Sequence, residues 1–140
     1  MRVKVFGTGG TISGHSDDPL DYRNYQSGRY TIDDILERAP DIHRHAEIVT
    51  EQFTNFSSRD MTPEHWVLLK RKIEDAFVHE HCDGVVITHG TNTLEETAYF
   101  LHLTVHSEKP VVLVGAQRPL SSVGTDAVIN LINAIRVAAA

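Results

Sequence analysis

The chain has 140 residues, of which 41% are hydrophobic and 23% are charged, and its formal net charge is -6. This composition is ordinary for one compact globular domain over residues 1–140, and the negative charge argues against a nucleic-acid surface. A single cysteine, Cys82, excludes an internal disulfide, and we see neither a signal-peptide pattern nor a long apolar span. We therefore expect no nucleic-acid partner, no membrane partner and a cytoplasmic location.

The first predicted strand, residues 2–6, runs into a glycine-rich segment, Gly7-Thr8-Gly9-Gly10-Thr11-Ile12-Ser13-Gly14. So many glycines predict a backbone that another group approaches closely, or one with positive φ. A phosphate-binding loop is the main alternative. The Walker pattern needs a Gly-Lys-Ser/Thr ending that is absent, and Ile12 occupies the place of the third glycine of the dinucleotide fingerprint. Nucleotide binding is therefore disfavoured.

Residues 15–30 form a long polar segment with little periodicity. Such a segment in a compact domain is usually functional or disordered. Because it follows the glycine-rich segment, it could be a lid that closes over a site, with Tyr25 as its most useful side chain. A mobile surface loop in which Tyr25 merely packs is an equally good interpretation of the composition.

The next elements are a short helix over residues 31–38, ending before Pro40, and a strand over residues 46–53. A second strand-end loop follows at residues 55–61. Thr62-Pro63-Glu64 then predicts a helix start with proline at the first helical position. This helix has a core-facing stripe, formed by Trp66, Leu69, Ile73 and Phe77.

The most informative stretch is a buried strand at residues 84–87 that leads directly into a helix. Thr93 and Glu96 have the spacing of a capping box, which places the helix start near Thr93 and leaves Thr91 and Asn92 on the turn. Ligands of open α/β sheets bind at such turns, outside the carboxyl ends of strands. A hydroxyl and an amide next to a helix N-terminus suit an anionic or carbonyl-bearing ligand.

The last unit repeats this pattern, with a strand at residues 110–114, a turn at 115–119 and a helix at 127–139. Strands and helices thus alternate, which predicts an α/β fold with a doubly wound, mostly parallel sheet and helices on both faces. Four loops should meet at one edge of that sheet. They carry Thr8 and Thr11, Ser57 and Ser58, Thr91 and Asn92, and Ala116 and Gln117.

The side chains on these loops limit the chemistry. The only acid beside them is Asp60, so acid/base work by a carboxylate pair is disfavoured. The nine histidines make no recognised metal-binding pattern, and His89 is expected to be hydrogen-bonded in place rather than catalytic. Threonine hydroxyls with backbone amides remain. They could form a covalent acyl-transfer site with an oxyanion hole, provided that a base activates the nucleophile.

Two of these motifs resemble signatures of the bacterial L-asparaginase family. Residues 5–13 are similar to the first signature and residues 84–94 to the second, with one departure. Residues 57–61 and 114–119 are similar to two further family stretches, so the resemblance covers almost the whole chain. It implies the amino-terminal domain of a threonine amidohydrolase that converts asparagine, and sometimes glutamine, to the acid and ammonia without a cofactor or metal.

The resemblance also implies catalytic roles for three residues. Thr11 corresponds to the nucleophile that attacks the amide carbon, and Tyr25 corresponds to the lid tyrosine that assists it. Thr91 corresponds to a second threonine, which activates water or the nucleophile together with a neighbouring acid and a lysine further along the chain.

On the substrate-binding side, the resemblance implies that Ser58 holds the α-carboxylate and that the backbone at Ala116 helps to form the oxyanion hole. Thr91, Arg59 and Asn92 are expected beside the substrate. Two of these positions depart from the family pattern, because Asn92 replaces an aspartate and Arg59 replaces a glutamine that many members have.

Family members are longer, have a second, smaller domain and form oligomers, whose sites borrow an acid from a neighbouring subunit. The 140 residues do not include the region that supplies the lysine. We therefore expect a homo-oligomeric amidohydrolase with a small-molecule substrate. The alternative is a fragment or binding module that holds a small amino-acid ligand and turns over slowly or not at all.

Overall fold

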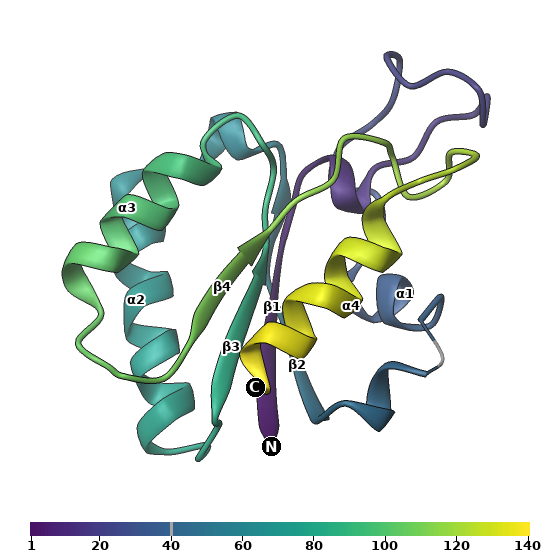
Figure 1. The fold of residues 1–140 in the computed structure, drawn as a ribbon. Helices are drawn as coiled ribbons and strands as arrows, with labels where there is room; N and C mark the ends of the chain where they lie inside the picture. The colour runs from purple at the N-terminus through teal and green to yellow at the C-terminus, as the bar shows by residue number, and fades with distance from the viewer. Residues whose placement is uncertain (40) are drawn as a thin grey trace.

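The computed structural model describes residues 1–39 and 41–140 and has a parallel sheet with helices on both faces (Figure 1). The strands are β1 (Arg2–Gly9), β2 (Glu47–Phe56), β3 (Gly84–Thr88) and β4 (Val111–Val114). Their spatial order is β2-β1-β3-β4, and every pairing between neighbours is parallel. The predicted doubly wound α/β fold is therefore confirmed.

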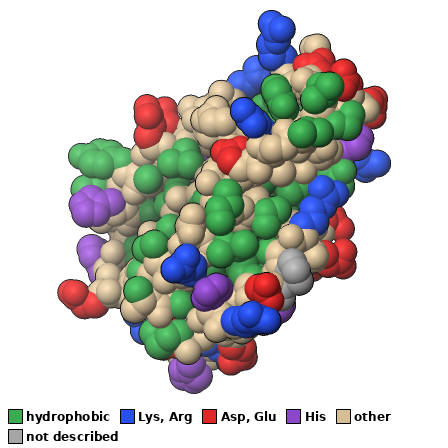
Figure 2. Space-filling model, turned by 45° about the vertical axis from the view of Figure 1, so that its right-hand side comes forward, with side chains coloured by type: hydrophobic (Ala, Val, Ile, Leu, Met, Phe, Trp, Pro, Cys, Tyr) green, Lys and Arg blue, Asp and Glu red, His purple; other side chains and the backbone are tan. Residues whose placement is uncertain are grey.

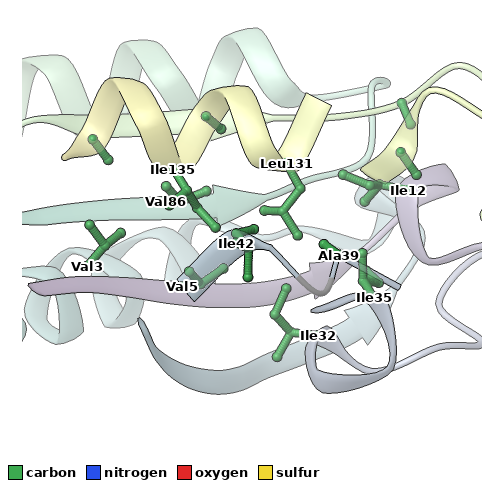
Figure 3. Close-up of a cluster of buried hydrophobic side chains, with 14 of the residues drawn as sticks. Val3, Val5, Ile12, Ile32, Ile35, Ala39, Ile42, Val86, Leu131 and Ile135 are labelled. Atoms are coloured by element: carbon green, nitrogen blue, oxygen red, sulfur yellow. The ribbon is translucent and has the colours of Figure 1, made fainter. Parts of the chain in front are cut away.

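Two hydrophobic clusters lie on opposite faces of the sheet. The helices are α1 (Ile32–Leu36), α2 (Pro63–Val78), α3 (Leu94–Thr104) and α4 (Ala127–Ala138). α1 and α4 cover one face, where Ile35, Leu131 and Ile135 pack against Val5 and Val86 of the sheet (Figures 1 and 3). α2 and α3 cover the other face, where the cluster includes Phe6, Leu69, Ile73, Ile87 and Leu101. The central strands β1 and β3 are thus buried from both sides, which explains the continuous apolar run of β3.

Local sequence signals explain where the first two helices, α1 and α2, begin. Thr31 caps α1 in a capping box with Asp34, and Thr62 caps α2 in a second box with His65, followed by Pro63 at the start. α1 ends at Leu36, and Pro40, before which we expected the end, lies outside the described residues. In the predicted stripe of α2, Leu69, Ile73 and Phe77 are buried and Trp66 is half-buried.

Both β1 and β2 are longer than predicted. β1 continues to Gly9, and β2 continues to Phe56, so part of each predicted loop belongs to the sheet. The register between them shifts after Gly7, which lets Gly9 pair with Phe56. The sequence patterns ended earlier because glycine and asparagine are poor strand formers, whereas here the pairing of two neighbouring strands extends them.

Among the described residues, the edge of the sheet that β4 forms is apolar. All residues of β4 are half-exposed, whereas all residues of β3 are buried. The neighbouring helices α3 and α4 expose Tyr99, Leu103, Ile129 and Val137. Figure 2 shows hydrophobic side chains near the middle of one face, with most of the charged side chains toward its rim. Such an edge favours association, and homo-oligomer formation stays a prediction on this basis.

Candidate active site

A cavity of about 220 Å³ lies where the loops after β1, β2 and β3 meet. The loop after β1 contributes Gly10 and Thr11, and the polar segment that follows it adds one further wall. The remaining walls come from the loops after β2 and β3. The full lining is Gly10, Thr11, Arg23, Tyr25, Ser27, Ser57, Ser58, Arg59, Gly90, Thr91 and Asn92. The cavity therefore lies at the predicted edge of the sheet.

Two glycines allow these loops to approach each other. Gly9 and Gly10 have φ values of 107° and 81°, in the region that favours glycine. A Cβ on Gly10 would lie 2.4 Å from the Cα of Gly90, so the backbones of the first and third loops are in direct contact there. The Gly10 amide also donates to the carbonyl of Phe56, at 2.9 Å, and so ties the second strand to the same point. The predicted close approach and positive φ are both confirmed.

Thr11 and Tyr25 form a hydrogen-bonded pair in this cavity. Thr11 lies on a short 3-10 turn, Thr11–Ser13, and is buried, with 7% of its surface exposed. Its Oγ1 is 2.6 Å from Oη of Tyr25, and either hydroxyl can be the donor. Tyr25 is held by backbone hydrogen bonds between His15 and Gln26, at 2.8 and 2.9 Å. The polar segment thus forms a wall of the cavity, and its role as a lid stays a prediction.

Ser58 presents a buried hydroxyl without a partner. The residue is 2% exposed, and its Oγ makes no hydrogen bond to any described residue. It lies next to Gly90, since a Cβ on that glycine would be 2.6 Å from the Ser58 Oγ. A buried hydroxyl without a partner costs free energy, of the order of 1–3 kcal/mol. A ligand oxygen in the cavity would supply the missing acceptor.

Thr93 has a role other than the predicted capping box. It is at the N-cap position of α3, as expected, but its side chain makes no capping hydrogen bond. Its backbone angles, φ -133° and ψ 23°, differ from the extended conformation that a capping residue usually adopts. The Thr93 hydroxyl instead donates to the carbonyl of Ser58 at 2.8 Å. The capping-box prediction was therefore wrong, and Thr93 joins the second and third loops.

His89 lies beneath the cavity in a fully paired chain of hydrogen bonds. It is completely buried, and its Nδ1 donates to the carbonyl of Gly90 at 2.7 Å. Its Nε2 therefore accepts from the Thr97 hydroxyl at 2.9 Å, and Trp66 Nε1 donates to that same hydroxyl at 2.8 Å. The prediction that His89 is hydrogen-bonded in place is confirmed.

This burial makes a pH dependence of stability predictable. Loss of solvent around His89 lowers the pKa of its imidazole from the ordinary value of 6.5. The unfolded chain therefore takes up a proton near pH 6.5, while the folded chain resists protonation. We expect the free energy of unfolding to fall as the pH drops below about 6.5, by up to about 1.4 kcal/mol per pH unit from this group.

Urea unfolding between pH 7.5 and 5 checks this expectation. His89→Gln should flatten the slope, whatever its effect on stability at neutral pH. The exposed His102 provides a matched control, because His102→Gln should leave the slope unchanged. An equal slope in the wild type and His89→Gln would show that other groups cause the acid sensitivity.

None of the four lysines lines the cavity. Lys4 is buried in the sheet, where its Nζ lies 3.2 Å from Glu51 and 2.9 Å from Glu80. Burial alone would lower the pKa of Lys4, but its hydrogen bonds to Glu80 and Glu51 hold it above the ordinary value. Lys70, Lys72 and Lys109 are likewise bonded elsewhere, to Glu74, Glu51 and the carbonyl of Cys82. In residues 1–39 and 41–140, no group of His, Cys, Asp or Glu could hold a metal ion.

The structure brings most of the predicted site residues together. Thr11, Tyr25, Ser58, Arg59, Thr91 and Asn92 all line the cavity. Ala116 does not, because its side chain is buried in the cluster beneath α4. Gly115, just before it, is close to the site, since a Cβ there would lie 3.1 Å from the methyl group of Thr91. The backbone role of Ala116 stays a prediction.

Sequence reasoning missed two lining residues of the polar segment, Arg23 and Ser27. Both are two positions from Tyr25, in a segment of bends and turns. The sequence has no strand periodicity there that would predict which side chains face the cavity. The pairing of His15 with Gln26, which folds the segment back, is visible only in the structure.

The chain is similar to known proteins over almost its whole length. The family model for the asparaginase N-terminal domain matches residues 2–140. A probable periplasmic L-asparaginase of Haemophilus influenzae is 44% identical over 138 residues, which are 99% of this chain and 39% of that protein. L-asparaginase 2 of Escherichia coli is 42% identical over 138 residues, again 99% of this chain and 39% of the relative.

The solved structures give the same result. A probable cytoplasmic L-asparaginase from Campylobacter jejuni superposes with a TM-score of 0.97 at 46% identity, covering 99% of this chain and 42% of the other. The chain thus spans about two fifths of the length of the relatives that it matches. With the family model, these similarities show that the chain belongs to the asparaginase family, in the part that the family's N-terminal model describes.

Proposed function

We propose that this chain is the nucleophile-bearing part of an amidohydrolase that converts L-asparagine to L-aspartate and ammonia. The observation that carries the proposal is the 2.6 Å hydrogen bond between Thr11 and Tyr25, in a cavity that also contains Ser58 and Thr91. A buried hydroxyl paired with a second hydroxyl suits a nucleophile with a proton relay. Relatives that are named L-asparaginases support the same reaction.

In the proposed mechanism, Thr11 Oγ1 attacks the side-chain amide carbon of the substrate. The C–N bond breaks, ammonia leaves, and an ester to Thr11 remains. Tyr25 accepts the threonine proton as it passes its own proton to the leaving nitrogen, so Tyr25 ends the step unchanged and one proton has moved, net, from the nucleophile side to ammonia. Water, activated at Thr91, then cleaves the ester to give the acid and restores Thr11. The Ser58 hydroxyl donates to the α-carboxylate throughout.

One observation favours the alternative, a binding module with slow or no turnover. No lysine, histidine, aspartate or glutamate is among the lining residues of the cavity. Tyr25 is therefore the only lining side chain with an ordinary acid/base role. A site with this composition can hold a small amino-acid ligand without cleaving it quickly.

The experiment that tests the proposal measures ammonia and aspartate released from L-asparagine by the purified protein. Equal amounts of the two products, formed over many turnovers, support the amidohydrolase. Glutamine assayed in parallel gives the preference between the two amides. Calorimetric binding of L-aspartate with no ammonia release would instead support the binding module.

Two further expectations concern the cell rather than the site. The names of the relatives place one protein in the periplasm and another in the cytoplasm, so the cytoplasmic location of this chain stays a prediction. Among the described residues, none of the helices is long and apolar enough to cross a membrane.

A further inference from the structure

The polar segment, residues 15–30, is attached to the loop between β4 and α4, residues 115–126, and the two lie side by side in Figure 1. The attachment centres on two serines. The backbone amide of Ser16 donates to the Ser121 Oγ at 2.8 Å, and that hydroxyl donates to the Ser16 carbonyl at 3.3 Å. Ser16 is buried, with 4% of its surface exposed. One hydroxyl of the loop thus satisfies both backbone groups of a buried residue in the segment.

Ser16 in turn lies next to the backbone on both sides of Tyr25. Its own Oγ is 3.1 Å from the carbonyl oxygen of Asn24, the residue before the tyrosine. Its neighbour His15 pairs through two backbone hydrogen bonds with Gln26, the residue after the tyrosine. The position of Ser16 therefore sets the position of the backbone that carries Tyr25.

The ring of Tyr25 meets the same loop at a second point. A Cβ on Gly14 would lie 3.0 Å from Cδ2 of Tyr25 and 3.4 Å from Cβ of Pro119. The ring and the proline therefore both lie against Gly14, which has no side chain to separate them. Pro119 is buried and stands two positions before Ser121.

Exposed residues extend the attachment toward solvent. The amide of Val123 donates to the carbonyl of Pro19 at 2.9 Å, and the hydroxyl of Tyr22 donates to the carbonyl of Val123 at 3.1 Å. The guanidinium carbon of Arg118 lies 5.0 Å from the centroid of the Tyr22 ring. These contacts are open to water, so each is expected to contribute less than the serine pair.

The loop between β4 and α4 is itself fixed to the body of the domain. Leu120 is 2% exposed and belongs to the hydrophobic cluster beneath α4. The carboxylate of Asp126, just before α4, accepts from the amides of Gln117 and Arg118 at 3.0 and 2.9 Å. Ser121 directly follows Leu120, so its hydroxyl is carried by a backbone that packing and hydrogen bonds hold in place.

We propose that Ser121 is a positioning residue for Tyr25. It fastens Ser16 to the loop after β4, and so keeps the Tyr25 hydroxyl within hydrogen-bond distance of Thr11. The polar segment contains no helix or strand, and contacts of this kind therefore decide where its side chains lie. Ser121 is not among the lining residues of the cavity and acts only through the backbone of the segment. This inference rests on the proposed function, since it concerns the same pair of hydroxyls.

Kinetics of ammonia release from L-asparagine test the positioning role. Ser121→Ala should lower kcat by about 10- to 100-fold, the usual effect of displacing a reacting group by a fraction of an ångström to an ångström. KM should stay nearly unchanged, because Ser58 and Thr91 lie on other loops. A loss of stability alone would lower neither constant at a temperature well below Tm.

A double-mutant cycle makes this test specific to Tyr25. Tyr25→Phe lacks the hydroxyl that is to be positioned, so adding Ser121→Ala to it should not lower kcat further. An equal decrease of kcat in the wild-type and Tyr25→Phe backgrounds would overturn the inference and leave the proposed function intact.

Hydrogen exchange of the backbone amides, read by mass spectrometry, tests the attachment without turnover. Ser121→Ala should speed exchange in peptides that cover residues 15–26 by about 5- to 100-fold, because it removes the partner of a buried amide. Exchange in β3 should not change. Ser107→Ala is the matched control, since it removes a hydroxyl that accepts from the exposed amide of Lys109. It should leave exchange over residues 15–26 as in the wild type.

The exchange measurement keeps the two proposals separate. If the wild type releases no ammonia, the proposed function fails, and the inference is decided by exchange alone. Faster exchange over residues 15–26 in Ser121→Ala, but not in Ser107→Ala, then supports the attachment through Ser121. Exchange that Ser121→Ala leaves unchanged would overturn the inference, whether or not the protein is active.

Discussion

Thr11→Val is expected to reduce ammonia release from the preferred amide by at least about 10³-fold, because it removes the nucleophile and its hydrogen bond to Tyr25. Valine has nearly the shape of threonine, so the short turn at Thr11–Ser13 should persist. The free energy of unfolding should change by only about 1 kcal/mol, the usual net value of one hydrogen bond. Initial rates and urea unfolding of the same preparation measure both quantities.

Two further variants sharpen this experiment. Thr11→Ser keeps a hydroxyl and should retain part of the activity, which a purely structural role for Thr11 would not require. Thr104→Val is the matched control, since it removes a threonine hydroxyl that bonds only to the carbonyl of Phe100 in α3. Its activity should equal that of the wild type. Undiminished turnover by Thr11→Val would eliminate Thr11 as the nucleophile.

Gly10→Ala is the second change for which we expect a large effect. Gly10 has φ 81° and ψ -170°, a conformation that is essentially restricted to glycine, and the added Cβ would lie 2.4 Å from the Gly90 Cα. Backbone strain costs about 1–3 kcal/mol and overpacking costs a similar amount. We expect the free energy of unfolding to fall by about 2–5 kcal/mol, with a decrease of Tm of roughly 5–15 °C.

The same substitution should abolish activity well below the melting temperature. Relief of the contact with Gly90 must push the first and third loops apart, which separates Thr11 from Thr91. Gly124→Ala is a suitable control because Gly124 also has positive φ, 66°, but a Cβ there meets only the end of the flexible Arg118 side chain. It should lose part of the stability and none of the activity. Equal losses of stability and of activity in the two variants would show that backbone strain alone causes the effect.

Much of this fold follows from the sequence because the central strands are simple. Residues 84–87 form one apolar run, and a helix stripe follows within a few positions, so the strand, its turn and its helix were all predictable. The extension of β1 to Gly9 was not predictable, because it depends on pairing with Phe56, almost 50 residues away in the sequence. Local propensity contains no information about such a partner.

The candidate site was likewise predictable only in part. Thr11 and Thr91 could be placed at the sheet edge from the strands that precede them. The hydrogen bond of Thr93 could not be predicted. Its hydroxyl can bond either to the first turn of its own helix or to the carbonyl of Ser58, and the packing of the two loops decides between these partners. Arg23 could not be placed either, since its contact with the cavity requires the polar segment to fold back across it.

The hydrogen-bonded chain beneath the cavity connects the tryptophan of the protein to the ligand site, so intrinsic fluorescence can report binding. Trp66 is the single tryptophan of the sequence, and its indole N–H is connected through Thr97 and His89 to the carbonyl of Gly90, which lines the cavity. Indole emission responds to the polarity and hydrogen bonding of its surroundings. A ligand that moves the Gly90 peptide is therefore expected to change the fluorescence of Trp66, so that the emission of this residue reports the occupancy of the cavity without an attached dye.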